Sequence, residues 1–161
     1  MKLTHLDSRG EARMVDVTAK QPTVRTAEAE ALVTCSPTIV EALREGTVPK
    51  GDVLAVARIA GIAGAKRVPD LLPLAHTIGV HGARVTLDIV DDGVAIHSEV
   101  KTADRTGVEM EALTAVTIAA LAVIDMVKGV DRSAEIAYAR VTRKSGGRSG
   151  EWSREEAGAL S

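Results

Sequence analysis

The chain has 161 residues, of which 45% are hydrophobic and 26% are charged, and its net charge is −2. These values are typical of one folded domain and exclude a wholly disordered protein. The small negative charge argues against nucleic-acid binding through a strongly basic body.

The N-terminal part of the chain predicts an arm and then a strand. Residues 1–23 show no sustained hydrophobic period, so we interpret them as a flexible polar arm in which 14–17 is a candidate docked strand. Small apolar residues alternate from Arg25 to Cys35, which favours a strand, although the alanines would also suit a helix. Cys35 is the only cysteine, and no apolar signal core opens the sequence, so we expect a cytoplasmic protein without disulfides.

Two helices are predicted next. Ser36 and the proline after it are typical of an N-cap and a first helical turn, and a glycine at 46 ends this helix. Asp52 can cap a second helix that runs toward residue 66, with Pro69 ending it. The small residues of this second helix favour close packing against a neighbouring element, although its two glycines weaken the helix.

The clearest local pattern is a hairpin. Alternating apolar residues flank Asp92-Gly93, a pair typical of a two-residue turn. This turn would pair Ile89 with Ile96 on one face of the sheet. On the other face it would pair Asp88 with His97, which would give that histidine a structural role.

A long helix is predicted from about Val108 to Lys128, and a last strand from Ile136 to Arg143. The resulting order is β-α-α-β-β-α-β. It favours an α+β fold in which helices cover one face of a single antiparallel sheet, as a ferredoxin-like sandwich. We find no internal repeat and no domain boundary, so 1–161 is interpreted as a single domain with a frayed tail over about 152–161.

The long helix contains a run of 13 uncharged residues, Ala112–Ile124, with no polar face. The run is too short to cross a bilayer, so we expect no membrane association and a helix buried on both sides. The chain has no Phe, one Tyr and one Trp, so its core must consist mainly of small side chains that bury little area each. We therefore expect one side of this helix to meet the sheet and the other side to meet another subunit.

Ionisable residues lie at both ends of the long helix. Asp125 and Lys128 share a face and can form an ion pair, for which an ordinary surface pair is the more common interpretation from spacing alone. At the other end lie Glu109 and Glu111. Glu111 and Asp125 are 14 residues apart, or about 21 Å along a helix axis, so one small pocket in one subunit can hardly use both ends. If residues at both ends of this helix take part in one site, that site is elongated or shared between subunits.

Basic residues recur near the ends of the predicted segments. The stretch from Ile136 to Gly150 has four cations and no acid, and its glycines could cradle phosphate; a flexible basic tail is the alternative. His76 follows an apolar run, and a packing role is the more common one for such a histidine. The histidine spacing does not match a zinc site, so no metal is expected.

Several segments resemble, in the same order, the cyclic pyranopterin monophosphate synthase family, the accessory protein C of molybdenum-cofactor biosynthesis. The likeness runs from about Leu3 to Trp152 and is most specific in the Thr-Gly-Val-Glu-Met-Glu-Ala-Leu-Thr stretch. The segments that carry it are Met14–Val17, Lys50–Val53, Ala57–Ile62, Ala65–Arg67, Asp70–Leu74, Arg105–Ala115, Asp125-Met126 with Lys128, and Lys144–Gly147.

The resemblance implies a pyrophosphate-releasing lyase. Its substrate would be (8S)-3′,8-cyclo-7,8-dihydroguanosine 5′-triphosphate, and its products cyclic pyranopterin monophosphate and pyrophosphate. Such a reaction needs positioned acids and bases and several cations for the triphosphate. The proton-transfer residues implied are Lys50, Lys128 and Asp125, with Asp125 orienting Lys128. The implied phosphate ligands are Arg25, Lys66, His76 and Lys144. The remaining implied substrate-binding residues are Leu74, Ala75, Glu109, Met110 and Glu111.

The two glutamates would engage the guanine-derived ring together. Residues at i and i+2 point to opposite sides of a regular helix, so we expect a helix start or an irregular turn at Glu109 and Glu111. One motif departs from the family. The usual Cys-His-Pro is replaced here by Ala75-His76-Thr77, which affects the phosphate geometry rather than the assignment.

The resemblance also implies a homohexamer, a trimer of dimers with its sites at the dimer interface, acting on a small-molecule triphosphate. It implies no resident cofactor, while Mg²⁺ bound to the triphosphate is compatible with it. Two other classes stay open from the residues alone. The acid–base set of Lys50, Asp125 and Lys128 argues against a non-catalytic nucleotide-binding regulator. The charges at the ends of the long helix argue against a purely structural oligomer.

Overall fold

Strand β1 (Thr23–Thr34) is the centre of a five-stranded antiparallel sheet in the computed structural model, which describes residues 6–147 and 150–154. It pairs with β3 (Gly93–Asp104) on one side and with β4 (Glu135–Ser145) on the other. The outer strands are β2 (Gly82–Val90) beside β3 and the short β5 (Trp152–Ser153) beside β4.

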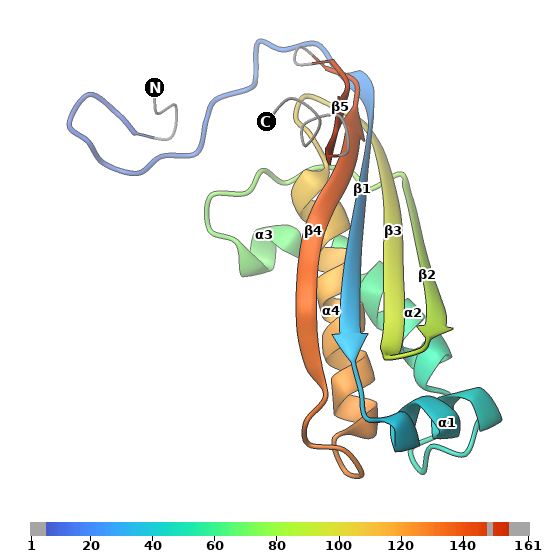
Figure 1. The fold of residues 1–161 in the computed structure, drawn as a ribbon. Helices are drawn as coiled ribbons and strands as arrows, with labels where there is room; N and C mark the ends of the chain where they lie inside the picture. Colours follow the sequence, from blue (N-terminus) through green and yellow to red (C-terminus); the bar gives the residue numbers. More distant parts are fainter. Residues whose placement is uncertain (1–5, 148–149, 155–161) are drawn as a thin grey trace.

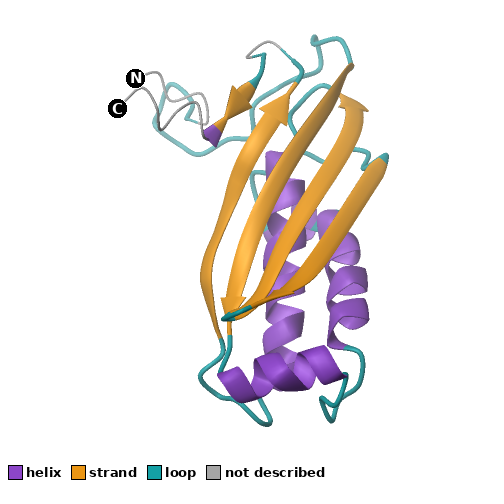
Figure 2. Ribbon diagram, turned by 45° about the vertical axis from the view of Figure 1, so that its right-hand side comes forward, coloured by secondary structure: helices purple, strands orange, loops and turns teal. Residues whose placement is uncertain are grey.

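The order β4-β1-β3-β2 is the ferredoxin-like arrangement that the sequence predicts, and β5 is an addition to it. The helices lie on one face of the sheet, as expected (Figure 2). They are α1 (Pro37–Glu45), α2 (Val53–Ala65), α3 (Val68–Leu71) and α4 (Glu109–Val127). The fold is therefore α+β. The predicted frayed tail is wrong at Trp152–Ser153, which pair with β4 as β5, and residues 155–161 of that tail lie outside the described part of the chain.

The ends of the helices agree with the sequence except in two details. The Asp52 carboxylate accepts a hydrogen bond from the main-chain N–H of Ala55 at 2.9 Å, so it caps α2 as predicted. Ser36 stands at the N-cap of α1, but its side chain makes no capping hydrogen bond. Pro69 does not end α2, which stops at Ala65. It lies instead in the first turn of α3, where its missing N–H leaves no hydrogen bond unmade.

The hairpin prediction is correct in its strands and wrong in its register. The loop consists of Asp91 and Asp92, because Gly93 already pairs with Val90. All predicted partners are therefore displaced by two positions, which leaves each side chain on its predicted face. Ile96 lies opposite Leu87 instead of Ile89, and His97 lies opposite Thr86 instead of Asp88. His97 contacts Glu28 on β1 instead, at 3.3 Å from Nε2 to Oε2.

Residues 14–17 do not form the docked strand that the sequence suggested. The described part of the arm leaves the upper end of β1 and extends as a loop to the left of the sheet (Figure 1), with one isolated bridge between Leu6 and Ala12. Two hydrogen bonds attach the described part of the arm, residues 6–22, to the rest of the chain. Arg105 donates from Nε to the carbonyl oxygen of Lys20 at 2.9 Å, and the His76 ring contacts the carbonyl of Val15.

The core lies between the sheet and helices α2 and α4, and it is built from Ala and Val as expected. The helices approach closely at the two glycines of α2. A Cβ built on Gly61 would lie 2.8 Å from the carbonyl oxygen of Ala115, and one on Gly64 would lie 2.9 Å from Ile118 Cβ. The absence of side chains at these two glycines therefore allows α2 to pack closely on α4, although glycine lowers the stability of the helix itself.

Helix α4 meets the sheet on one side and α2 on its flank, while a third side remains open in the single chain. Leu121 on that side is 51% exposed. By length and composition alone α4 could cross a membrane, a test that the core helix of a water-soluble protein also passes, and 44% of its apolar window is buried within the chain.

Candidate active site

Lys50, Asp125 and Lys128 meet at the C-terminal end of α4. The Lys128 ammonium lies 2.7 Å from Oδ1 of Asp125, and the Lys50 ammonium lies 3.3 Å from Oδ2 of the same carboxylate. Lys50 also donates to the main-chain carbonyl oxygen of Asp125 at 2.7 Å. The ion pair expected from spacing is thus present, and the loop between α1 and α2 adds the second lysine to it.

One carboxylate shared by two ammonium groups is held ionised. The hydrogen bond from Lys128, followed by that from Lys50, lowers the pKa of Asp125 below its usual value. About half of each side chain is exposed, so the cluster stands at the surface where a substrate can reach it. Chemically it offers two fixed proton donors beside one fixed acceptor.

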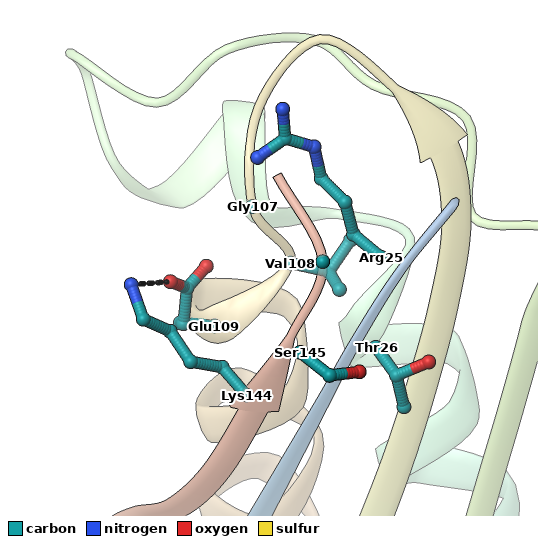
Figure 3. A pocket seen from close by; sticks show the side chains of 8 residues that line it. Arg25, Thr26, Gly107, Val108, Glu109, Lys144 and Ser145 are labelled. Atoms are coloured by element: carbon teal, nitrogen blue, oxygen red, sulfur yellow. Dashed lines mark ion pairs between the residues drawn. The ribbon is translucent and has the colours of Figure 1, made fainter. Parts of the chain in front are cut away.

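A second group of charged residues lies at the opposite end of α4, around its first turn. Glu109 is the first helical residue, as the helix-start prediction required, and its carboxylate pairs with Lys144 of β4 at 3.2 Å (Figure 3). A cavity of about 160 Å³ opens beside this pair. Its lining consists of Arg25, Thr26, Gly107, Val108, Glu109, Lys144, Ser145 and Gly146.

Main-chain groups and glycines set the positions of the charges in this cavity. Arg25 donates from Nε to the carbonyl oxygen of Asp104 at 3.1 Å and from Nη2 to that of Arg105 at 3.3 Å. Gly147, with φ of 75°, leaves space for the Arg25 guanidinium, which a Cβ would overlap. Gly107 gives the same freedom to Glu109, whose carboxylate folds back over it. In the described part of the chain, the two glycines of the Lys-Ser-Gly-Gly stretch allow it to lie close against β1. Arg148 and Ser149, which also belong to the predicted phosphate cradle, lie outside the described residues.

Glu111 is the buried acid of this end of the helix. It is 4% exposed, and burial, with a smaller contribution from the charge of Glu109, raises its pKa to about 7, while His76 acts in the opposite direction. His76 places Nε2 at 2.6 Å from the carbonyl oxygen of Val15. A carbonyl only accepts, so Nε2 carries a proton in this contact. His76 therefore connects the arm to the surroundings of Glu111.

The apolar members of the predicted site form a shallow hollow beside this group. Leu74, Ala75 and Met110 are brought together there, and Leu74 and Met110 are each about 40% exposed. The other lining residues are Ala12, Leu72 and Pro73. An exposed apolar wall next to an acid and a histidine suits a flat heterocycle that carries polar edges.

The structure separates the predicted site residues into two sets. Lys50, Asp125 and Lys128 lie at the C-terminal end of α4, which is its lower end in Figure 1, and the cavity and the hollow lie around its N-terminal end. A helix of 19 residues is about 28 Å long, so one chain does not bring both sets to one small molecule. Lys66 is exposed at the end of α2 and lines neither the cavity nor the hollow.

Sequence reasoning assigned no role to Thr26 or Gly107, which also line the cavity. Gly107 lies in the Arg105–Ala115 segment that carries the family resemblance, whereas no local pattern marks Thr26. Ser145, another lining residue, belongs to the predicted phosphate cradle. In the described part of the chain, no group of three or more His, Cys, Asp or Glu side chains is placed to hold a metal ion.

Comparison with known proteins gives one consistent result. A family model described as the MoaC family matches residues 14–147. A relative from Streptomyces avermitilis is 61% identical over 153 residues, which cover 95% of this chain and 90% of the relative, and is named cyclic pyranopterin monophosphate synthase. A relative from Nocardioides with the same name is 56% identical, with 95% and 96% covered. A relative from Mycobacterium tuberculosis, cyclic pyranopterin monophosphate synthase 3, is 52% identical, with 96% and 88% covered. The chain belongs to the MoaC family.

Proposed function

We propose that this chain is a cyclic pyranopterin monophosphate synthase of molybdenum-cofactor biosynthesis. It converts the cyclised dihydro-GTP named above into cyclic pyranopterin monophosphate and pyrophosphate. The name of its relatives supports this assignment. The observation that carries it in the structure is the cluster of Lys50, Asp125 and Lys128, drawn from distant parts of the sequence onto one carboxylate.

Ring closure at phosphorus needs a proton acceptor and neutralised charge. A ribose hydroxyl attacks the α-phosphorus, its oxygen–phosphorus bond forms and the bond to the pyrophosphate oxygen breaks. The hydroxyl proton passes to the Asp125 carboxylate, the acceptor of the cluster, while an ammonium group of Lys50 or Lys128 donates a proton to the leaving pyrophosphate. Lys50, Lys128 and Asp125 are thus the proposed proton-transfer groups, and Asp125 also holds both ammonium groups in place. Fixed positions matter here because proton transfer requires hydrogen-bonding distance to the reacting atoms.

The phosphates are assigned to the cations of the other set. Arg25 and Lys144 flank the cavity at the start of α4, and with Lys66 and His76 they supply the positive charge that a leaving pyrophosphate needs. Glu109, Glu111 and the Met110 main chain are assigned to the guanine-derived ring, with Leu74 and Ala75 beside it.

Both sets can serve one substrate if two chains share the site. We therefore include in the proposal a homohexamer, a trimer of dimers, in which the lower end of one α4 and the upper end of another meet at a dimer interface. The open side of α4, with Leu121 half exposed, supports a further protein contact. We also include a cytoplasmic location and no nucleic-acid or membrane partner. We assign no Mg²⁺ to the site, and the assay is therefore run with and without Mg²⁺, which can bind to the triphosphate.

The test is direct. Purified protein is incubated with the cyclised dihydro-GTP, with and without Mg²⁺, and pyrophosphate and cyclic pyranopterin monophosphate are measured. Release of both products supports the proposal. Tight binding of the triphosphate without product would identify a nucleotide-binding regulator, and absence of both binding and product would identify a structural oligomer.

A further inference from the structure

Asp131 is a buried carboxylate three residues beyond the proposed proton-transfer group Lys128. It is 8% exposed, and both of its oxygens accept hydrogen bonds. Oδ2 accepts from the main-chain N–H of Ser36 at 2.8 Å. Oδ1 accepts from the main-chain N–H of Ser133 at 2.8 Å and from its hydroxyl at 2.6 Å.

These bonds connect the two segments that carry the cluster. The N–H of Asp131 donates to the carbonyl oxygen of Val127 at 2.9 Å, which fixes the residue to the last turn of α4. Its carboxylate then reaches Ser36, the residue that starts α1. The chain runs from α1 through a short loop to Lys50. Asp131 therefore bonds the α4 end that bears Lys128 to the segment that leads to Lys50.

The bond to Ser36 has a clear physical basis. The side chain of Ser36 makes no capping hydrogen bond, although its residue type is suited to one. A carboxylate from another part of the chain stands at this helix start instead, where negative charge is stabilised by the helix dipole. The Ser133 hydroxyl, followed by the N–H groups of Ser36 and Ser133, lowers the pKa of Asp131 to about 2, so it stays ionised at neutral pH.

We propose that Asp131 is a positioning residue for the Lys50–Asp125–Lys128 cluster, which it serves by holding the end of α4 against the start of α1. This inference rests on the proposed function of that cluster. The Asp131 carboxylate is buried and already accepts three hydrogen bonds, so it does not contact the substrate itself. It acts by keeping the two lysines in position. A displacement of about 1 Å between reacting groups can cost about 100-fold in rate, which is the scale on which such a bond would matter.

Two variants break the bond to Ser36 from opposite sides. Asp131→Asn keeps one side-chain oxygen for Ser133 and turns an NH₂ toward the Ser36 N–H. Ser36→Pro removes that N–H while fitting the observed φ of −64°. Each has a matched control at the same place. Ser133→Ala deletes the 2.6 Å hydrogen bond within the loop, and Ser36→Thr keeps both the main-chain N–H and a hydroxyl at position 36, so both leave the Ser36–Asp131 connection in place.

The experiment measures kcat, KM and Tm of these four variants and of the wild type, using pyrophosphate release. We expect Asp131→Asn and Ser36→Pro to lose about 10- to 100-fold in kcat with KM within about twofold, because the phosphates are held elsewhere. The controls should keep kcat within about twofold even where Tm falls. Equal kcat losses in variants and controls at equal Tm, or unchanged kcat in both connection variants, would overturn the positioning role. An inactive wild type would instead overturn the proposed function, and this inference with it.

Discussion

The Lys50 ammonium donates to the main-chain carbonyl oxygen of Asp125 at 2.7 Å and lies 3.3 Å from the carboxylate oxygen of the same residue. The two residues are 75 positions apart in the sequence. Both contacts are made within one chain, as is the contact of Lys128 with the other carboxylate oxygen. One chain therefore contributes the whole cluster, and this decides which mutants can complement each other.

Lys50→Ala and Lys128→Ala should each abolish product while the fold persists. General acid–base catalysis contributes about 10²- to 10⁴-fold, so kcat should fall by that order. Both side chains are about half exposed, and ion pairs exposed to water add little to stability, so Tm should change by less than about 4 °C. Lys101→Ala, which removes another exposed ion pair on the sheet, is the control and should keep full activity. Near-normal pyrophosphate release by either cluster variant would refute its role.

Mixed oligomers test whether the site is shared. Lys50→Ala and Lys128→Ala subunits should not complement each other after dissociation and reassembly, because both lesions fall in the same cluster. Lys128→Ala and Lys144→Ala fall at opposite ends of α4, so random equal mixing should restore about one quarter of the dimer-interface sites. Activity measured after reassembly distinguishes these cases. A stable, active monomer in sedimentation at micromolar concentration would contradict the shared site altogether.

Gly107→Ala should impair substrate binding without touching a charged residue. The added methyl would overlap the Glu109 carboxylate, which must then leave its position beside Lys144. We expect a rise in KM of about tenfold, which corresponds to roughly 1.4 kcal/mol. Gly82→Ala is the matched control, because its methyl would meet Lys101 Cβ at an ordinary 3.8 Å. Equal kinetics of the two alanine variants would show that the Glu109 position is unimportant.

His76→Ala separates phosphate binding from packing. The ring contacts Val15 and is partly buried, so a structural role has a definite form here, namely attachment of the arm. If the histidine also binds phosphate, the dissociation constant of the substrate should rise by about tenfold or more while Tm falls by only a few degrees. Calorimetric binding and thermal unfolding give the two numbers. A large drop in Tm with unchanged affinity in the remaining folded protein would establish the packing role.

Glu111 should make stability depend on pH in the direction opposite to that of most carboxylates. Its pKa of about 7 in the folded chain exceeds the ordinary 4.5, so the folded state holds a proton that the unfolded chain releases. The free energy of unfolding should therefore fall as the pH rises from about 4.5 to about 7. Glu111→Gln lacks this contribution and should match the wild-type Tm near pH 5 and exceed it at pH 8. A Tm difference that is the same at both pH values would refute the raised pKa.

The sequence predicted most of the fold because the apolar pattern determines which face of each strand is buried. Its limit is visible in the hairpin. Alternation specifies the parity of the pairing but not the partner, so a shift of two residues moved the loop to Asp91-Asp92 without exposing any core side chain. Helix α3 escaped prediction because four residues are too few for a periodic signal, and Pro69 indicates a helix start as well as an end.

The site was predictable in its residue types and not in its contacts. Spacing alone gave the pair of Asp125 with Lys128, since three residues along a helix are neighbours. Lys50 entered through the family resemblance, because its contact depends on how the loop after α1 packs on α4. The same holds for Val15 against His76 and for Ser36 against Asp131, both contacts across long stretches of chain. Contacts between residues far apart in the sequence depend on tertiary packing, and local sequence patterns carry no information about that packing.

The central place of β1 has a consequence for synthesis on the ribosome. One edge of this strand pairs with β3 and the other with β4, whose Arg140 meets Glu30 across 110 positions of chain. While the chain is still growing, β1, β2 and β3 can assemble, but the far edge of β1 keeps its hydrogen-bonding groups unpaired until β4 has emerged. An open edge in mid-sheet is a template for pairing with other chains. The nascent protein is therefore most prone to aggregate during the interval between completion of α4 and arrival of its penultimate strand.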